Sequence, residues 1–243
     1  MKNSKLIILF LLIFTSCQLL SEKNDEKNAD TRIIKSYYKK SGALKSEITV
    51  KDNKKNGPAK KYYPSGEVHT VVNYVDGIKD GETVWYYKNG QPYRVTPYSN
   101  GKMHGLRKKY YENGTLQAEI PYENGDLVEG TKEFKQDGSL ISQDARIIFE
   151  TIDLLKSDNK YTLKIRLSEK SSKLEFFEEK TATNGNKILV PIKANLSGTA
   201  KLEYYLPLGS FKMSVLKIYA KYETRLRNPV LIKSSFNLAI ENR

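Results

Sequence analysis

Two extended runs of alternating apolar and polar residues recur about every 24 residues between positions 31 and 143. The clearest unit, Gly81–His104, reads GETVWYYKNGQPYRVTPYSNGKMH. Its aromatic first run leads to the turn at Lys88–Gly90, and its second run ends at Tyr98. Glycine permits the positive φ that a tight turn between two strands requires. Each unit is therefore predicted to be a β-hairpin.

The 24-residue spacing holds in several columns of the sequence at once. A lone hairpin is only marginally stable, so successive hairpins are expected to stack into one array over residues 31–143. The columns that keep the spacing are Gly42, Gly66, Gly90, Gly114 and Gly138; Tyr38, Tyr62, Tyr86, Tyr110 and Phe134; Tyr74, Tyr98 and Tyr122; and Gly57, Gly81 and Gly105.

Alternation along a strand divides each hairpin into two faces. The Tyr86 column is expected on the packed face, together with the second-strand column of Val72, Thr96 and Ile120. Lysines and aromatic residues then share the opposite face, which is the candidate binding surface; the alternative is a solvated lysine-rich surface that aids solubility. The residues of this stripe are Lys61, Tyr63, Trp85, Tyr87, Lys109 and Tyr111.

The pattern G-x-x-x-x-Y-Y-x-x-G, which begins at Gly57, Gly81 and Gly105, resembles the bacterial variant of the MORN repeat. This variant occurs in proteins labelled YwqK-family antitoxins. The resemblance covers residues 31–143, with a divergent first unit and a shortened last unit. It implies a MORN-like array of stacked hairpins, and the related eukaryotic repeats are usually linked to membrane or protein contacts without catalysis.

After about Arg146 the period disappears, and seven strand-like runs follow within residues 144–243. They predict a β-sandwich, immunoglobulin-like in broad shape, which makes the whole chain all-β. A helix at Ile147–Leu155 is an open alternative, because its apolar residues also share a helical face. The runs are Arg146–Leu155, Tyr161–Ser168, Lys173–Glu179, Lys187–Ile192, Thr199–Leu206, Met213–Tyr222 and Val230–Ile240.

The N-terminus resembles a bacterial lipoprotein signal. Lys2 and Lys5 precede the apolar run Leu6–Phe14, which is too short to span a bilayer, and Cys17 follows two small residues. The resemblance implies that residues 1–16 are removed and that Cys17 is acylated, with residues 17–30 as a polar, flexible tether. The alternatives are an ordinary signal peptide or a buried N-terminal strand, with Cys17 incidental. The resemblance to lipoproteins also implies the outer membrane, because Gln18 and not Asp follows the Cys.

Composition restricts the chemistry available to the chain. One Cys and two His among 243 residues exclude an internal disulfide and a cysteine-rich zinc site. His69 and His104 are expected to be exposed strand or loop residues, and adjacent strand positions place Glu178 and Glu179 on opposite faces. We therefore predict no catalytic residue, no metal site and no cofactor, and hence a protein that is not an enzyme.

The net charge of +13 favours anionic partners. An envelope location favours lipid headgroups or surface polysaccharide over nucleic acid, which is not expected as a partner. The sequence thus predicts an outer-membrane lipoprotein, facing the periplasm or the surface, that binds or scaffolds a protein or envelope polymer. The alternatives are an antitoxin-like protein that neutralises a toxin, and an envelope hydrolase with an unrecognised site.

Overall fold

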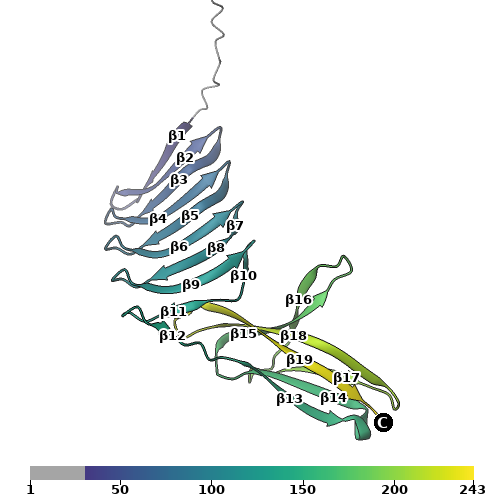
Figure 1. The fold of residues 1–243 in the computed structure, drawn as a ribbon. Helices are drawn as coiled ribbons and strands as arrows, with labels where there is room; N and C mark the ends of the chain where they lie inside the picture. Colours follow the sequence, from purple (N-terminus) through teal and green to yellow (C-terminus); the bar gives the residue numbers. More distant parts are fainter. Residues whose placement is uncertain (1–30) are drawn as a thin grey trace, which may run out of the picture.

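The computed structural model describes residues 31–243, and this part of the chain is almost entirely β (Figure 1). Strands β1–β12 form one antiparallel sheet, and seven further strands form two smaller sheets. The only helix in the described range is the single turn α1 (Leu155–Asp158). The expected signal segment, the acylated Cys17 and the tether lie outside the described residues.

The large sheet is a ladder of hairpins in which nearly every strand pairs with the strand before it and the strand after it. This arrangement confirms the predicted array of stacked hairpins. The strands are β1 (Thr31–Tyr37), β2 (Leu44–Lys51), β3 (Lys54–Tyr62), β4 (Val68–Val75), β5 (Ile78–Tyr86), β6 (Pro92–Ser99), β7 (Lys102–Met103), β8 (Gly105–Tyr110), β9 (Leu116–Glu123), β10 (Asp126–Leu127), β11 (Lys132–Phe134) and β12 (Leu140–Ile141).

Glycines close the turns at both ends of the hairpins. At one end, the amide of Gly90 donates to the carbonyl of Tyr87 at 3.1 Å, and Gly90 has a φ of +83°. At the other end, the amide of Gly101 donates to the carbonyl of Lys79 at 2.8 Å, which joins one repeat to the preceding one. Residues that carry a side chain rarely adopt such positive φ values, so these turns explain why glycine recurs with the repeat.

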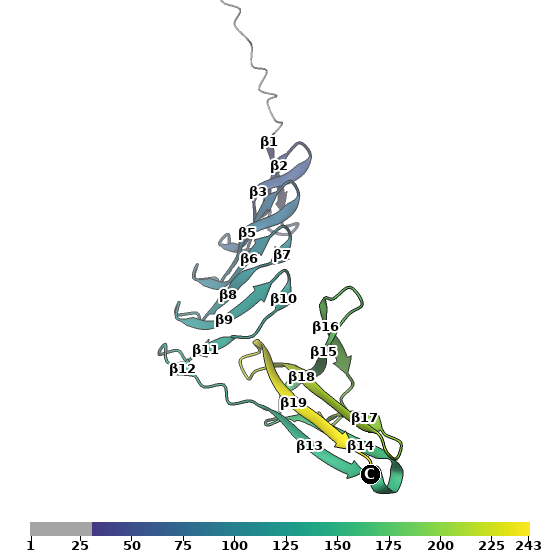
Figure 2. The same cartoon turned by 45° about the vertical axis from the view of Figure 1, so that its right-hand side comes forward.

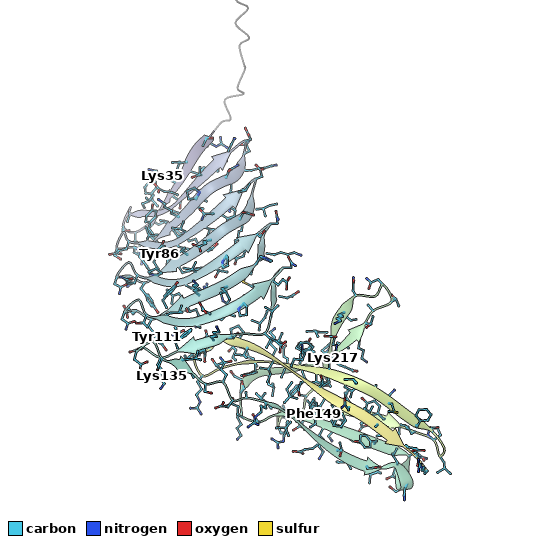
Figure 3. All side chains as sticks on the ribbon, in the orientation of Figure 1. Lys35, Tyr86, Tyr111, Lys135, Phe149 and Lys217 are labelled. Carbon is cyan, nitrogen blue, oxygen red and sulfur yellow. The ribbon has the colours of Figure 1, made fainter. Side chains whose placement is uncertain are left out.

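A ladder of tyrosine hydroxyls runs along one edge of the sheet, beside the hairpin turns. Each hydroxyl donates to a backbone carbonyl of the next hairpin: Tyr38 to Tyr62 (2.7 Å), Tyr63 to Tyr86 (2.7 Å), Tyr87 to Tyr110 (2.8 Å) and Tyr111 to Phe134 (2.8 Å). In the last turn Lys135 takes the tyrosine's place, and Figure 3 shows Tyr111 and Lys135 in successive hairpins at this edge.

This ladder corrects the placement of Tyr38. Its carbonyl accepts from Gly42, four residues later, whereas that of Tyr63 accepts from Gly66, three residues later. The first turn is therefore one residue longer than the others. Tyr38 corresponds to Tyr63, and the prediction that it corresponds to Tyr62 was wrong.

The C-terminal strands confirm the predicted sandwich. One sheet contains β13 (Ile147–Leu154), β14 (Lys160–Leu167) and β17 (Ala200–Tyr205); the other contains β16 (Lys187–Ile192), β15 (Ser172–Thr181), β18 (Phe211–Glu223) and β19 (Pro229–Glu241). Both sheets contribute to one apolar core, in which Leu163, Ile165, Phe176, Ile218 and Leu238 are almost completely buried. Residues 147–154 pair with β14 along their whole length, so the helical alternative was wrong.

The ladder of hairpins meets the sandwich at the turn between β18 and β19, as both views show (Figures 1 and 2). The hydroxyl of Thr131 donates to the carbonyl of Pro229 at 3.0 Å, and Lys233 forms an ion pair with Glu129 at 3.4 Å. These contacts join the last repeats to the start of β19.

Candidate binding face

The strand register defines the two faces of the large sheet. Directly opposed residues of an antiparallel pair lie on the same face. Thr83 opposes Val72 on one side and Thr96 on the other, and Thr70 opposes Trp85. We call this side the threonine face, because Thr70, Thr83 and Thr96 are all buried on it. The opposite side, with Val71, Val84 and Val95 opposed in the same way, we call the valine face.

The predicted assignment of the stripe to a face was wrong. Trp85 lies two residues from Thr83, and Lys109 lies two residues from Arg107, which opposes Ile120. Both therefore share the threonine face with the packed column of Val72, Thr96 and Ile120. The register shifts by one residue between Trp85 and Tyr86, and likewise in the neighbouring repeats. The Tyr86 column lies just beyond this bulge. Counting alternate residues along one strand therefore does not show which residues of the next strand share its face.

The structure brings together three of the six stripe residues. Lys61, Trp85 and Lys109 belong to a single row that crosses the sheet on the threonine face. Tyr63, Tyr87 and Tyr111 lie at the turns instead, where their hydroxyls bind the next repeat. In strand order, the row consists of Ser46, Lys61, Thr70, Trp85, Arg94, Lys109, Ala118 and Glu133.

Charge is segregated between the two faces. Within strands β2–β11, Glu133 is the only carboxylate on the threonine face. The valine face is mixed, with Glu47, Glu82 and Glu119 beside Lys60 and Lys108. The cations of the threonine face are Lys55, Lys61, Lys79, Arg94, Arg107 and Lys109.

Four of these cations lie over aromatic rings of the same face. The guanidinium carbon of Arg94 lies 3.9 Å from the ring centroid of Trp85, and that of Arg107 lies 4.8 Å from Tyr122. Cation–π attraction fixes the position of a charged group while its remaining donors stay available. Two similar pairs, each at 4.9 Å, are Lys55 over Tyr74 and Lys79 over Tyr98.

Sequence reasoning missed Arg94, Arg107 and the rings of the Tyr74 column as parts of this face. The 24-residue spacing of Tyr74, Tyr98 and Tyr122 was a usable signal. Tyr98 opposes Gly81, and Tyr122 opposes Gly105, so the two recurring columns meet across each hairpin. That relationship depends on the register and is not visible along one strand.

The two arginines are only partly solvated. The Nε atoms of Arg94 and Arg107 are buried, and neither has a hydrogen-bond partner among residues 31–243. Burial lowers the pKa of Arg107, and the nearby charge of Arg94 adds to this effect. Burial also lowers the pKa of Lys109, and the charge of Arg107 acts in the same direction. The face therefore concentrates positive charge at a desolvated position.

The end of the threonine face is covered by the turn between β18 and β19. Nζ of Lys109 donates to Oδ1 of Asn228 at 2.7 Å and to the carbonyl of Leu226 at 3.4 Å. Oε1 of Glu133 accepts from the hydroxyl of Thr224 at 2.6 Å and from the side-chain amide of Asn228. A buried lysine and a buried glutamate of the repeat sheet are thus satisfied by one turn of the sandwich.

The other residues considered for chemistry have structural partners. The ring of His69 packs edge-on against Tyr63 at 4.6 Å, and its Nδ1 lies 2.9 Å from the hydroxyl of Thr70. Glu178 pairs with Lys180 at 3.2 Å, whereas Glu179 accepts from the hydroxyl of Tyr219 at 2.8 Å. Among residues 31–243, no three His, Cys, Asp or Glu side chains are grouped as a metal site would require.

A hollow in the sandwich is open to solvent. It has a volume of about 1070 Å³ and is bordered by β15 and by the loops at residues 168–171 and 193–199. Leu174, Phe176 and Ile192 contribute its apolar lining. It is separate from the threonine face, whose residues do not line it.

Comparison with known proteins identifies the repeat. Residues 55–76, 79–100 and 103–124 each match the model of the MORN repeat variant. These segments run from β3 to the turn after β9, the part of the sheet that carries the cation–aromatic pairs. A search of curated proteins found no match. Within residues 31–243, no helix has the length and apolar character needed to cross a bilayer.

The fold and these matches place three MORN-variant repeats in the middle of a longer sheet of stacked hairpins, which is followed by a β-sandwich. These repeats indicate a binding or scaffold role that depends on the repeat sheet.

Proposed function

We propose that this chain is a lipid-anchored binding or scaffold protein of the cell envelope, which presents the threonine face to a protein or an envelope polymer. One observation carries the binding part of the proposal. Six cations lie on the threonine face within strands β2–β11, and the single carboxylate there is engaged by the β18–β19 turn. A surface of this kind attracts negatively charged partners.

The anchor is supported by the sequence alone. The apolar run Leu6–Phe14 ends three residues before the chain's single cysteine, Cys17, and a polar stretch follows. Strand β1, where the described chain begins, lies at the end of the ladder away from the sandwich (Figure 1). An anchor attached before β1 would hold the sheet by that end and leave the threonine face of the middle repeats accessible.

The scaffold part is supported by the junction between sheet and sandwich. The buried contacts of Lys109 and Glu133 with the β18–β19 turn join the two parts through specific hydrogen bonds. A partner held on the repeat sheet would therefore be held at a defined position relative to the sandwich.

Crosslinking in cells tests the proposal. The tagged protein is crosslinked, solubilised from the envelope in detergent and purified, and its partners are identified by mass spectrometry. Trp85 and Arg94 form a directly opposed pair on the threonine face, so Trp85→Ala/Arg94→Ala is expected to lose the partner. Val84→Ala/Val95→Ala removes the neighbouring opposed pair on the valine face and should retain it. Equal recovery with both variants would eliminate the threonine face as the binding surface.

A further inference from the structure

Three cations lie side by side where the threonine face approaches the sandwich. Arg94 directly opposes Lys109 across β6 and β8, and Arg107 lies two residues before Lys109 on the same face. Of these three cations, only Lys109 has a hydrogen-bond acceptor within residues 31–243: its ammonium donates to Oδ1 of Asn228 and to the carbonyl of Leu226. The two guanidiniums form no ion pair with any residue in the described range 31–243.

The contact at Lys109 shows which kind of group this face accepts. The acceptors are an amide oxygen and a backbone carbonyl oxygen of one polypeptide turn. The Asn228 side chain has the same shape as an aspartate, and its Oδ1 is the neutral counterpart of a carboxylate oxygen. Next to this turn, Arg94 and Arg107 offer charged donors that would bind a carboxylate more strongly than an amide.

The rings of Trp85 and Tyr122 hold these guanidiniums in place. An arginine stacked on an aromatic ring loses less conformational freedom when it binds an anion, because its position is already restricted. The buried Nε atoms add an unsatisfied donor on each side chain. Buried donors without partners are rare in folded proteins and call for an explanation.

From this geometry we infer that Arg94 and Arg107 form a binding site for the carboxylates of an acidic polypeptide segment, which is contributed by the partner of the proposed function. The segment docks beside the β18–β19 turn and extends the contact that Asn228 makes with Lys109. This inference rests on the proposed function, because it specifies the chemistry of the partner that binds the same face.

The single tryptophan of the chain provides a local readout, because Trp85 lies in contact with Arg94. The probe is poly-L-glutamate, titrated into the full-length protein in detergent at low salt while the fluorescence of Trp85 is recorded. We expect a saturable change in emission, and an affinity at least about tenfold weaker when salt is raised to screen the charges.

Two variants of equal charge test the position of the site. Arg94→Gln/Arg107→Gln should weaken poly-L-glutamate binding at least about tenfold, since it removes both charged donors. Lys60→Gln/Lys108→Gln removes two cations from one row of the valine face and should bind like the unmodified protein. Circular dichroism and thermal melting establish that both variants are folded, and Arg94→Lys/Arg107→Lys, which keeps the charges, should recover part of the affinity.

Each contrary result overturns the inference. It fails if poly-L-glutamate leaves Trp85 emission unchanged, or if both Gln variants lose binding equally. It also fails if inorganic polyphosphate or phosphatidylglycerol vesicles bind at this site and poly-L-glutamate does not. The proposed function is tested separately by crosslinking in cells. If a partner is captured in a manner that depends on Trp85 but poly-L-glutamate does not bind, the proposed function still holds and only the inference of an acidic segment is rejected.

Discussion

The ammonium nitrogen of Lys109 lies 2.7 Å from the side-chain oxygen of Asn228, a residue 119 positions further along the chain. Lys109 belongs to the third matched MORN repeat, whereas Asn228 lies in the turn before the last strand of the sandwich. Asn228 is completely buried, and its amide also donates to Glu133. The side chain of Asn228 thus forms hydrogen bonds with two buried charged residues of the repeat sheet.

Replacing this asparagine should weaken the junction. Asn228→Ala leaves the charged groups of Lys109 and Glu133 without their shared partner in a buried position. We expect a loss of about 2–4 kcal/mol in the free energy of unfolding, because unsatisfied buried charges are costly. Urea denaturation measures the loss, and limited proteolysis should show faster cleavage at residues 142–146. Asn186→Ala, in an exposed hairpin turn, is the control; similar stability of the two variants would contradict this account.

The tyrosine ladder predicts a smaller, repeated effect. Tyr87→Phe removes the hydroxyl that donates to the carbonyl of Tyr110 at 2.8 Å but keeps the ring. We expect it to lower the free energy of unfolding by about 1 kcal/mol, the usual contribution of one such hydrogen bond. Tyr205→Phe, which alters an exposed ring, should change it by much less. If the two variants unfold at the same urea concentration, the ladder does not stabilise the repeats.

Two tyrosines that folding largely removes from water, Tyr222 and Tyr204, should make the protein less stable in alkali. Burial raises the pKa of Tyr222 and of Tyr204 from 10 to about 12. Between these values the unfolded chain has lost protons that the folded chain still holds, so the free energy of unfolding falls as the pH rises. Urea midpoints measured across this range, with tyrosinate absorbance as a second probe, should show the fall. Tyr222→Phe should make the slope shallower, and a midpoint independent of pH would rule out this linkage.

The sequence predicts that Cys17 anchors the protein. Cys17→Ala should move the protein from the membrane pellet to the soluble fraction, because acyl chains contribute about 0.8 kcal/mol for each methylene buried in the bilayer. Mass spectrometry of the mature N-terminus should find an acylated cysteine in the unmodified protein. Ser16→Ala, next to the cleavage position, is the control and should stay with the membrane. A variant without Cys17 that still sediments with membranes would remove the anchor from the proposal.

Much of the fold could be predicted because it depends on local patterns. The regular spacing of glycines such as Gly90 and Gly114 predicts the hairpin turns, since each needs a positive φ. Alternation predicts the seven C-terminal strands, because one side of each strand must face a core. For residues 147–154 the local pattern also allowed a helix, and it is the pairing with β14 that makes this segment a strand.

The candidate site was only partly predictable. The repeat drew attention to Trp85 and Lys109, but not to Arg94, which the strand register places directly opposite both. The bulge beside Tyr86 and the longer turn after Tyr38 each shift the relation between sequence spacing and position in the sheet by one residue. Because side chains alternate with a period of two, such a shift exchanges the faces.

By itself, the sequence determined that the chain folds into repeated hairpins followed by a seven-stranded sandwich, because turns and alternation act over a few residues. Only the tertiary structure decided which face collects the cations and which turn covers its end. The first depends on hydrogen-bonded register between strands. The second depends on Lys109 and Asn228 meeting across 119 residues, a contact that no local preference specifies.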